Sequence, residues 1–345
     1  MSSRGRTLLV AALVVVVLLL GGALLPVPYV ALGPGPTFNT LGQVDGQPLI
    51  DISGRQTYPA TGHLNLTTVS VASPLDLGSA LVGWLDSSVA VVPRQLVFPP
   101  GRSRKQVEAE DTQQMVESQQ HATTAALRQL GIPVPAQVQV ASLQAGLPAA
   151  AELRVGDTIT TIDGTAVTSA DQLRMLIGRR APGDAVSVGY VRDGRAETAS
   201  IRTTTAPRAP NRALIGLSPR EVPQYPFSVK IRLQDVGGPS AGLMFALGIY
   251  DELTPGDLTG GAFVAGTGEI DDAGTVGPIG GIRQKVIAAR QQGATVFLAP
   301  AANCAELAGA TPKGLRLVKV TNLAGALDAL EQLRTGGSSL PSCGS

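Results

Sequence analysis

The hydrophobic pattern is most concentrated near the start of the chain. Residues 7–25 (TLLVAALVVVVLLLGGALL) give 19 positions without a charge, with two arginines before them and two prolines soon after. A helix of this length covers close to the ~30 Å hydrocarbon core of a bilayer. Positive charge before the segment predicts a cytoplasmic N-terminus over residues 1–6 and an extracytoplasmic chain beyond. We therefore expect a single-pass transmembrane helix over residues 7–25. A cleaved signal peptide is the alternative, but the stretch is long for one and no clear A-x-A site precedes the prolines.

The pattern changes twice in the next hundred residues. Residues 28–98 are rich in glycine and proline and contain GHLNLTTVSVAS (62–73), which alternates like a strand. Residues 99–131 begin with PPGRSRKQVEAEDTQQMVESQQH, which is polar nearly throughout. We expect strands over the first range, then a polar linker leading into a solvated helix that ends at Gly131.

Residues 132–204 have the pattern of a compact unit. AQVQVASL predicts a strand, and LRVGDTITTIDG predicts a second strand ending in an Asp-Gly turn. Ser169 is placed to cap a following helix, and two alternating strands flank Asp193-Gly194, which predicts a hairpin. This order resembles a PDZ domain of the kind attached to bacterial proteases, with GD.I..IDG as its strongest part. A generic α+β module is the alternative.

Strands and helices alternate again from residue 222 to residue 333. A Pro/Arg-rich linker over residues 205–221 comes before this unit, and a tail over residues 334–345 follows it. The pattern predicts a sheet covered by helices, so the fold class of the whole chain is α+β. The expected elements are FSVKIRL, SAGLMFALGIYDEL, GAFVAGTGEI, GIRQKVIAARQQG, TVFLAP and NLAGALDALEQLR.

Composition excludes some partners and leaves others open. The formal net charge is +1 with 3% aromatic residues and no basic stripe, so nucleic acid is not an expected partner. There is no CxxC motif and no Cys/His cluster, so we expect neither a metal nor a cofactor. The two cysteines, Cys304 and Cys343, both follow the predicted anchor. They can form a disulfide in an oxidising exterior, although the sequence alone leaves an unpaired state open.

One serine stands at an unusual corner, GGPSAG (237–242). Gly237 and Gly238 allow backbone and substrate to approach closely, and Pro239 fixes φ. Ser240 is expected at the start of a helix, where free N–H groups and the helix dipole favour negative charge. A serine nucleophile needs such donors for its oxyanion and a base beside it. An ordinary helix cap is the competing interpretation of Ser240.

The candidate base is a lysine. The two histidines have unpromising contexts, because His121 lies in the polar helical stretch and His63 opens a strand. A lysine can act as base when burial makes its amine neutral. The chain has 22 arginines and five lysines, and Lys285 stands one turn into a helix among Val286, Ile287, Ala288 and Ala289. An exposed, charged lysine is the alternative.

Three sequence blocks together resemble the Lon-type (S16) protease domain, a Ser–Lys dyad peptidase. They are GGPSAG (237–242), TGEI (267–270) and GTVGPIGGIRQKVIAA (274–289), in the family's order and with 45 residues from Ser240 to Lys285. The resemblance implies Ser240 as nucleophile, Lys285 as general base and a Thr267 hydroxyl that holds the lysine amine. The chain differs from the family pattern at Gly237, where an acidic residue is common. The chain also has no G-x-x-x-x-G-K-[ST] loop, so the resemblance does not include an ATPase module.

The whole arrangement resembles the membrane-anchored PDZ–S16 proteins of bacteria. The resemblance implies a membrane-anchored serine endopeptidase that works without cofactor outside the cytoplasm. Its PDZ unit is expected to capture extended or unfolded, membrane-proximal substrates by strand addition. Residues 28–98 are expected to join the S16 sheet, which makes the PDZ unit an insertion. A hexamer is implied by the resemblance alone. The alternatives are an inactive membrane-bound PDZ adaptor, or a protein that cuts only its own residues 100–120.

Overall fold

The computed structural model describes residues 12–14, 16–17, 21–59, 61–206, 209–233, 236–337 and 340–343. The chain divides into two compact units, one formed by Met1–Ile132 with Phe227–Ser345 and the other by Pro133–Pro226. Part of the expected transmembrane segment, residues 7–11, 15 and 18–20, lies outside the described residues. Within the described part of the chain, no helix combines the length and the apolar character that crossing a bilayer requires.

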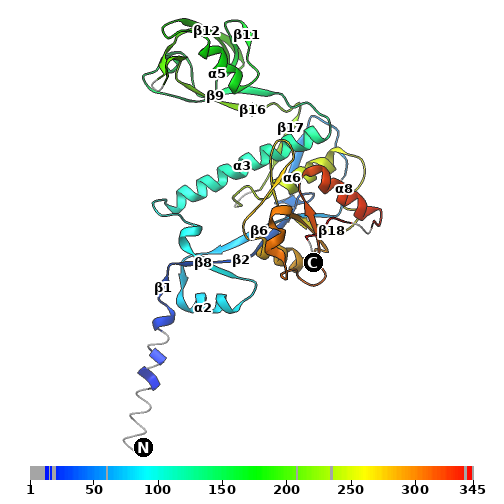
Figure 1. Ribbon diagram of the computed structural model, residues 1–345. Helices are drawn as coiled ribbons and strands as arrows, with labels where there is room; N and C mark the ends of the chain where they lie inside the picture. Colours follow the sequence, from blue (N-terminus) through cyan, green and yellow to red (C-terminus); the bar gives the residue numbers. More distant parts are fainter. Residues whose placement is uncertain are drawn as a thin grey trace, which may run out of the picture. The chain divides into compact units, whose positions relative to one another are not determined.

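The larger unit is built on a six-stranded mixed sheet (Figure 1). Strand β18 lies at its centre, parallel to β6 on one side and to β21 on the other, while β2 is antiparallel to β6. Strands that precede residue 100 therefore share one sheet with strands that follow residue 260. In order across the sheet, the strands are β22 (Arg316–Val320), β21 (Val296–Pro300), β18 (Phe263–Gly266), β6 (His63–Ala72), β2 (Tyr29–Asn39) and β8 (Ala90–Pro93).

Helices cover both faces of this sheet. Val264 and Leu298 point into a core with helices α3 (Arg104–Gln129), α6 (Gly242–Leu253) and α8 (Leu323–Arg334). Their strand neighbours Ala265 and Phe297 point the other way, into a core with α7 (Ile282–Gln291) and the 3-10 helix η2 (Ala301–Leu307). Successive residues of a strand face opposite sides of the sheet, so the apolar residues of β18 and β21 contribute in turn to the core on each face.

The smaller elements of this unit lie around the main sheet. In the structure, Cys304 of η2 and Cys343 of the tail form a disulfide. Pro341 accepts a hydrogen bond from the Lys319 N–H at 2.9 Å, which holds the tail beside β22. The remaining elements are β1 (Pro26–Val27), β3 (Gln43–Val44), β4 (Gln47–Pro48), β5 (Ile50–Ser53), β7 (Leu75–Asp76), α2 (Leu77–Leu85), η1 (Arg94–Leu96), β17 (Ser228–Ile231), β19 (Glu269–Ile270) and β20 (Val276–Gly277).

Helix α3 differs from the solvated helix that its polar sequence predicts. Ser103 caps it in a capping box with Gln106, as polar residues at a helix start often do. Residues 122–127, however, are buried, and Ala122, Ala125 and Ala126 pack into the core with α6. The small alanine side chains allow α3 and α6 to approach closely. The buried Thr123 hydroxyl donates a hydrogen bond to the Gln119 carbonyl at 2.8 Å. The expectation of a solvated helix is therefore wrong for its second half.

The smaller unit has a sheet in the order β13–β12–β10–β9–β16. Ser169 caps α5, since its hydroxyl accepts from the Gln172 N–H, as the sequence predicts. Asp193 and Gly194 form the β12–β13 hairpin with φ of 50° and 77°. Its elements are β9 (Ala136–Leu143), α4 (Ala149–Glu152), β10 (Thr158–Ile162), β11 (Thr165–Ala166), α5 (Ala170–Gly178), β12 (Ala185–Arg192) and β13 (Arg195–Arg202).

The range 205–221, expected as a linker, contains strands in the structure. These are β14 (Thr204–Ala206), β15 (Ala209–Leu214) and β16 (Leu217–Pro223). β16 pairs with β9, and Ile215 is buried in the core of the smaller unit. Because proline is uncommon in strands, Pro219 argued against a strand here in the sequence. In the structure, Pro219 follows a register shift on an edge strand, a position where proline is tolerated.

Candidate active site

Ser240 lies just before helix α6 and does not cap it. The N-cap residue is Ala241, and no side chain makes a capping hydrogen bond there. The Ser240 carbonyl instead accepts two hydrogen bonds, from the Gly268 N–H at 2.8 Å and from Thr267 Oγ1 at 2.9 Å. The helix-cap interpretation of Ser240 is therefore wrong, and its hydroxyl is free to bond elsewhere.

The Ser240 hydroxyl meets the amine of Lys285. Lys285 Nζ lies 2.7 Å from Ser240 Oγ and 3.0 Å from Thr267 Oγ1, both hydrogen-bonding distances. Thr267 thus contacts both partners, because its hydroxyl donates to the Ser240 carbonyl and accepts from the lysine amine. The three residues that the sequence blocks suggested are brought together in one cluster.

Lys285 is buried, with 3% of its surface exposed. Burial lowers the pKa of its amine from 10.5 to about 7, because the charged form loses its hydration. Among the residues that the structure describes, no ion pair includes Lys285. The amine is therefore neutral in a large fraction of molecules at neutral pH.

The glycine-rich segment before α7 allows Lys285 to lie beside Ser240. Gly281 starts the helix with φ of 68°, a left-handed conformation that favours glycine. A Cβ at this position would lie 2.7 Å from Val69 Cγ2 on strand β6. Gly281 therefore lets the first turn of α7 pack directly against the sheet, and Lys285 follows as the fourth helical residue.

Helix α3 holds the other side of the nucleophile loop. The Gly238 N–H donates to the Asp111 carbonyl at 2.9 Å, and Ser118 Oγ donates to the Pro239 carbonyl at 2.9 Å. A Cβ at Gly237 would come within 2.7 Å of Asp111 Cβ, so glycine is needed for this approach. Sequence analysis missed Asp111 and Ser118, because nothing local links them to a loop more than 100 residues away.

The same contacts narrow the set of oxyanion donors. The Gly238 N–H is already bonded to the Asp111 carbonyl, and Pro239 has no N–H, so neither residue can supply a donor. Within the described residues, no backbone hydrogen bond uses the N–H of Ser240 or of Ala241. These two groups remain available to an oxygen bound beside Ser240.

Two family models match separate parts of the chain. A PDZ domain model matches residues 107–203, and the model of the Lon protease (S16) C-terminal proteolytic domain matches residues 234–331. The second match contains Ser240, Thr267 and Lys285. The chain thus combines a PDZ domain with a Lon-type (S16) proteolytic domain. Its Lon-type domain is similar to the proteolytic domain of Lon proteases.

Individual relatives align with one domain at a time. The serine protease Do-like HtrA of Lactococcus lactis subsp. cremoris is 46% identical over 77 residues, covering 21% of this chain and 19% of the relative. The Lon protease of Roseiflexus castenholzii is 44% identical over 70 residues, covering 20% of this chain and 8% of the relative. The chain therefore spans less than a fifth of the length of these curated relatives.

A solved structure resembles the PDZ domain. The PDZ domain of an SdrC-like protein from Listeria monocytogenes is 32% identical and covers 24% of this chain and 85% of that chain. The TM-score is 0.22. The PDZ family match begins inside α3, whereas the smaller compact unit begins at Pro133.

A cleft of about 590 Å³ lies beside the nucleophile loop of the Lon-type domain. Pro239 forms part of its wall, and α3 and β19 supply most of the rest. Its lining is acidic, through Glu117, Glu269 and Asp271. His121 also lines it, with Nδ1 2.7 Å from Asp272 Oδ1, while His63 stacks on Phe263 at 4.4 Å between ring centroids. Both histidines thus have partners other than Ser240.

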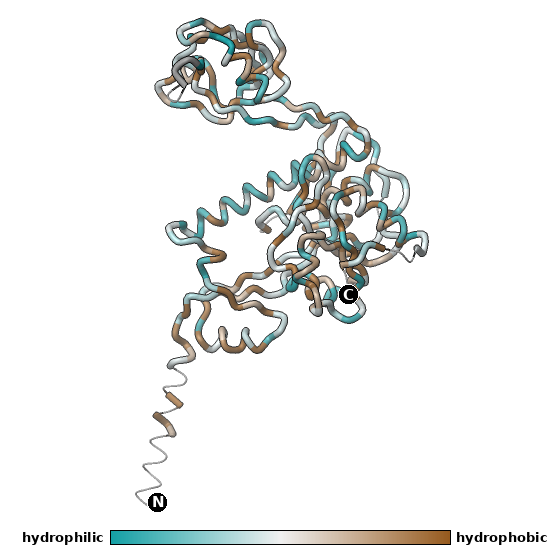
Figure 2. Tube along the Cα trace, viewed as in Figure 1, coloured by the Kyte–Doolittle hydropathy of each residue, from teal (hydrophilic) through white to brown (hydrophobic). Residues whose placement is uncertain are grey.

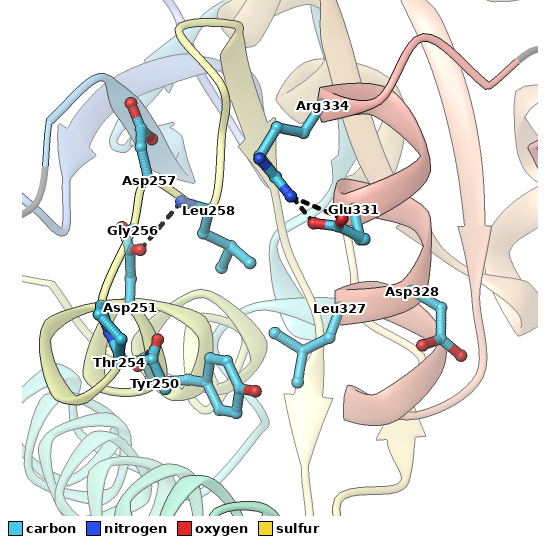
Figure 3. A pocket seen from close by; sticks show the side chains of 11 residues that line it. Tyr250, Asp251, Thr254, Gly256, Asp257, Leu258, Leu327, Asp328, Glu331 and Arg334 are labelled. Carbon is cyan, nitrogen blue, oxygen red and sulfur yellow. Dashed lines mark hydrogen bonds and ion pairs between the residues drawn. The ribbon is translucent and has the colours of Figure 1, made fainter.

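A second pocket, of about 420 Å³, lies between the C-terminal end of α6 and α8 (Figure 3). α6 is about 18 Å long, so this pocket is at the far end of the helix from Ser240. Asp251 is buried there, and burial raises the pKa of its carboxyl to about 6. Its Oδ1 accepts from the Leu258 N–H at 3.0 Å. None of Ser240, Thr267 and Lys285 lines this pocket.

No metal centre is evident among the described residues, where no group of three or more His, Cys, Asp or Glu side chains is arranged to hold an ion.

Proposed function

We propose that this protein is a membrane-anchored serine endopeptidase with a Ser240–Lys285 dyad. The observation that carries the proposal is the 2.7 Å distance between Ser240 Oγ and a buried Lys285 amine that forms no ion pair among the described residues. A serine hydroxyl is a weak nucleophile until a neighbouring base takes its proton. A buried lysine with a pKa near 7 can take that proton at neutral pH.

The proposed reaction has two stages. Neutral Lys285 accepts the Ser240 proton as Oγ attacks the peptide carbonyl, and the N–H groups of Ser240 and Ala241 hold the oxyanion. The protonated lysine then gives its proton to the leaving amine, which leaves an acyl-enzyme. Lys285 next accepts a proton from water, which attacks the ester carbonyl, and then returns that proton to Ser240 Oγ as the ester bond breaks. The new carboxylic acid is released and ionises in water, and both residues are back in their starting states.

Thr267 is proposed as a positioning residue for this reaction. Its hydroxyl contacts the lysine amine and the Ser240 carbonyl at once, which fixes the distance between base and nucleophile. In this role it never needs to exchange a proton with the substrate.

The proposed substrates are extended or unfolded polypeptides close to the membrane. A PDZ domain binds a chain by adding it as a strand to a sheet edge, which requires an extended segment. The membrane anchor is proposed over residues 7–25, with the domains outside the cytoplasm, on the uncharged run and the arginines before it. A Cys304–Cys343 disulfide fits that oxidising side. A hexamer stays a prediction.

The test compares cleavage of unfolded casein by the full chain and by the variants Ser240→Ala and Lys285→Arg. We expect the wild-type protein to cleave and both variants to lose at least ~10³-fold in activity, because removing a nucleophile or base disables the unit. Arginine keeps the positive charge but cannot serve as base. Cleavage by all three proteins, or by none, contradicts the proposal.

Self-processing is the competing outcome of the same experiment. It predicts cuts only within the protein's own residues 100–120. Most of that range lies in helix α3, which must unwind before it can enter a peptidase site as an extended chain. An inactive adaptor, in contrast, gives no cleavage of either chain and still binds extended peptides.

A further inference from the structure

We propose that helix α2 (Leu77–Leu85) lies in the lipid interface and gives the protein a second membrane contact beside its N-terminal anchor. This inference rests on the proposed membrane anchor and adds a separate surface to it. The feature that points to lipid is an uncharged helix with an exposed apolar face, fixed where residues 21–25 enter the folded domain.

The outer face of α2 is apolar and open. Its sequence LGSALVGWL has no charged residue, and only Ala80 and Gly83 are buried. A surface helix of a soluble domain normally presents charged or polar residues to water on its outer side. Here residues spaced three and four apart form one exposed apolar face, consisting of Leu81 (50% exposed), Val82 (68%), Trp84 (55%) and Leu85 (89%).

Direct bonds fix α2 at the base of the N-terminal apolar segment. Strand β1 pairs with β7, the two residues immediately before the helix, and the Leu77 N–H donates to the Leu25 carbonyl at 2.9 Å. Leu24 and Leu25 are themselves 76% and 58% exposed. The N-terminal end of α2 thus lies directly beside the segment that would enter the bilayer, and Figure 2 shows apolar residues along this part of the chain.

The aromatic residues suit the interface between lipid and water. Trp84 stands on the exposed face, and Tyr29 packs against it edge-on with ring centroids 5.9 Å apart. Tryptophan and tyrosine are enriched at the headgroup level of membranes because each has an apolar body and a polar tip. A short apolar helix at this level lies in the plane of the interface and does not cross the bilayer.

The charged residues that flank α2 in the sequence are Asp76 and Asp86, one at each end of the helix. Asp76 caps the helix, its carboxylate accepting from the Ser79 N–H at 2.8 Å. Asp86 follows the last helical residue and accepts from Ser88 N–H and Oγ. Both carboxylates therefore have hydrogen-bond donors and can remain at the water side while the apolar face enters lipid.

The experiment uses a property of this chain: Trp84 is its single tryptophan. The full protein is reconstituted into vesicles of phosphatidylcholine and phosphatidylglycerol, with either brominated acyl chains or iodide in the water as quencher. We expect strong quenching of Trp84 by the bromolipid and a several-fold smaller quenching by iodide than for the same protein unfolded in denaturant. Iodide quenching without bromolipid quenching overturns the proposal.

Protection from both quenchers also overturns it, because Trp84 is then covered by protein and not by lipid. A protein that does not float with the vesicles contradicts the anchor and the α2 contact together. A protein that floats but exposes Trp84 to iodide contradicts the α2 contact alone. Casein cleavage in the same vesicles is read separately, so a failure of the peptidase proposal is distinguishable from either result.

A matched pair of variants separates a specific contact from a general loss of apolar surface. Val82→Gln is compared with Val155→Gln, because the two valines are 68% and 64% exposed and Val155 belongs to the PDZ domain. We expect iodide quenching of Trp84 to rise several-fold in Val82→Gln and to stay unchanged in Val155→Gln. An equal response of both variants contradicts the proposal.

Discussion

Each unit of the molecule buries a charged side chain, and the two units treat that charge in opposite ways. Lys285 in the Lon-type domain is 3% exposed, and Asp157 in the PDZ domain is 2% exposed. Asp157 is held bidentately by Arg192, with N–O distances of 2.9 and 2.7 Å, and also accepts from the Arg154 N–H. Burial alone raises the pKa of the Asp157 carboxyl, but the hydrogen bonds from Arg192 and Arg154 outweigh it and lower the pKa.

The difference separates a structural charge from a reactive one. Asp157 keeps its charge because an opposite charge and several donors replace the water it lost. Among the described residues, the Lys285 amine hydrogen-bonds only to hydroxyl groups, so it gives up its proton near neutral pH. A buried ionisable group without a counter-ion is costly to keep, and such groups are concentrated at active sites.

Removing the lysine amine is expected to have the largest effect. Lys285→Met should lower casein cleavage by at least ~10³-fold, because the base is gone. It should also stabilise the Lon-type domain. The unfolded lysine binds its proton up to pH 10.5 and the folded one only to about 7, so the native state is penalised below pH 10.5 and regains stability as pH rises from 7 to 10.5. Chemical denaturation at pH 7 measures the change.

Lys313→Met is the matched control for that variant, because Lys313 is exposed in the same domain. We expect it to change neither activity nor stability appreciably. A Lys285→Met protein that is less stable than wild type at pH 7 contradicts the view that the buried amine is a net cost.

The opposite stability change is expected in the PDZ domain. Asp157→Ala leaves Arg192 without its main partner and should lower the free energy of unfolding of that domain by about 2–3 kcal/mol. Hydrogen exchange of peptides from the PDZ domain measures it. The exposed Asp171, paired with Arg174, serves as comparison, and Asp171→Ala should cost less than ~1 kcal/mol. An equal loss of unfolding free energy in the two variants would contradict the view that the buried Asp157–Arg192 pair contributes more than the exposed Asp171–Arg174 pair.

The pH dependence of cleavage sharpens the comparison at Lys285. The neutral amine is the active form, so kcat/KM should rise about tenfold from pH 6 to pH 8, around the lysine pKa of about 7. Initial rates with a fluorogenic casein measure the profile. Asp157→Ala should leave its midpoint in place. A profile whose acidic limb lies near pH 10 would mean that Lys285 titrates as an ordinary exposed lysine.

The smallest effect is expected from the scaffold that holds the nucleophile loop. Ser118→Ala removes the hydrogen bond to the Pro239 carbonyl and should lower kcat about fivefold, in line with about 1 kcal/mol for one hydrogen bond. The pH midpoint should not move, because the amine is untouched. Thr112→Val removes a hydroxyl from the exposed side of the same helix and should leave kcat unchanged. Equal losses in both variants would point to a general effect on α3.

The residues of the proposed dyad could be named from the sequence because short local blocks resemble the Lon-type (S16) domain. GGPSAG and GGIRQK are short runs in which glycine positions one reactive residue, and the rarity of lysine drew attention to Lys285. The strands and helices of the Lon-type domain followed from their alternating and helical patterns. These patterns do not tell how far apart two side chains lie in space. The 2.7 Å distance between Ser240 Oγ and Lys285 Nζ is known only from the fold.

The contribution of α3 could not be predicted for the same reason. Its sequence is polar, and its burial depends on a match between its alanines and the surface of α6, which belongs to a segment more than 100 residues later. Strand β16 was missed because arginine and proline obscure its alternation, and its pairing with β9 is decided by tertiary contact. In both cases the partner surface, and not the local sequence, selects the structure.

The pairing of β6 with β18 has a consequence for the order in which the protein can be made. His63 lies opposite Phe263, so the sheet of the Lon-type domain joins positions 200 residues apart. Contacts of such high sequence separation form slowly, and a growing chain emerges from its N-terminus first. The PDZ domain is one continuous segment of the chain, so its sheet can form while β6 is still unpaired on the side that later binds β18. The site around Ser240 can therefore form only after the chain has been synthesised beyond Lys285.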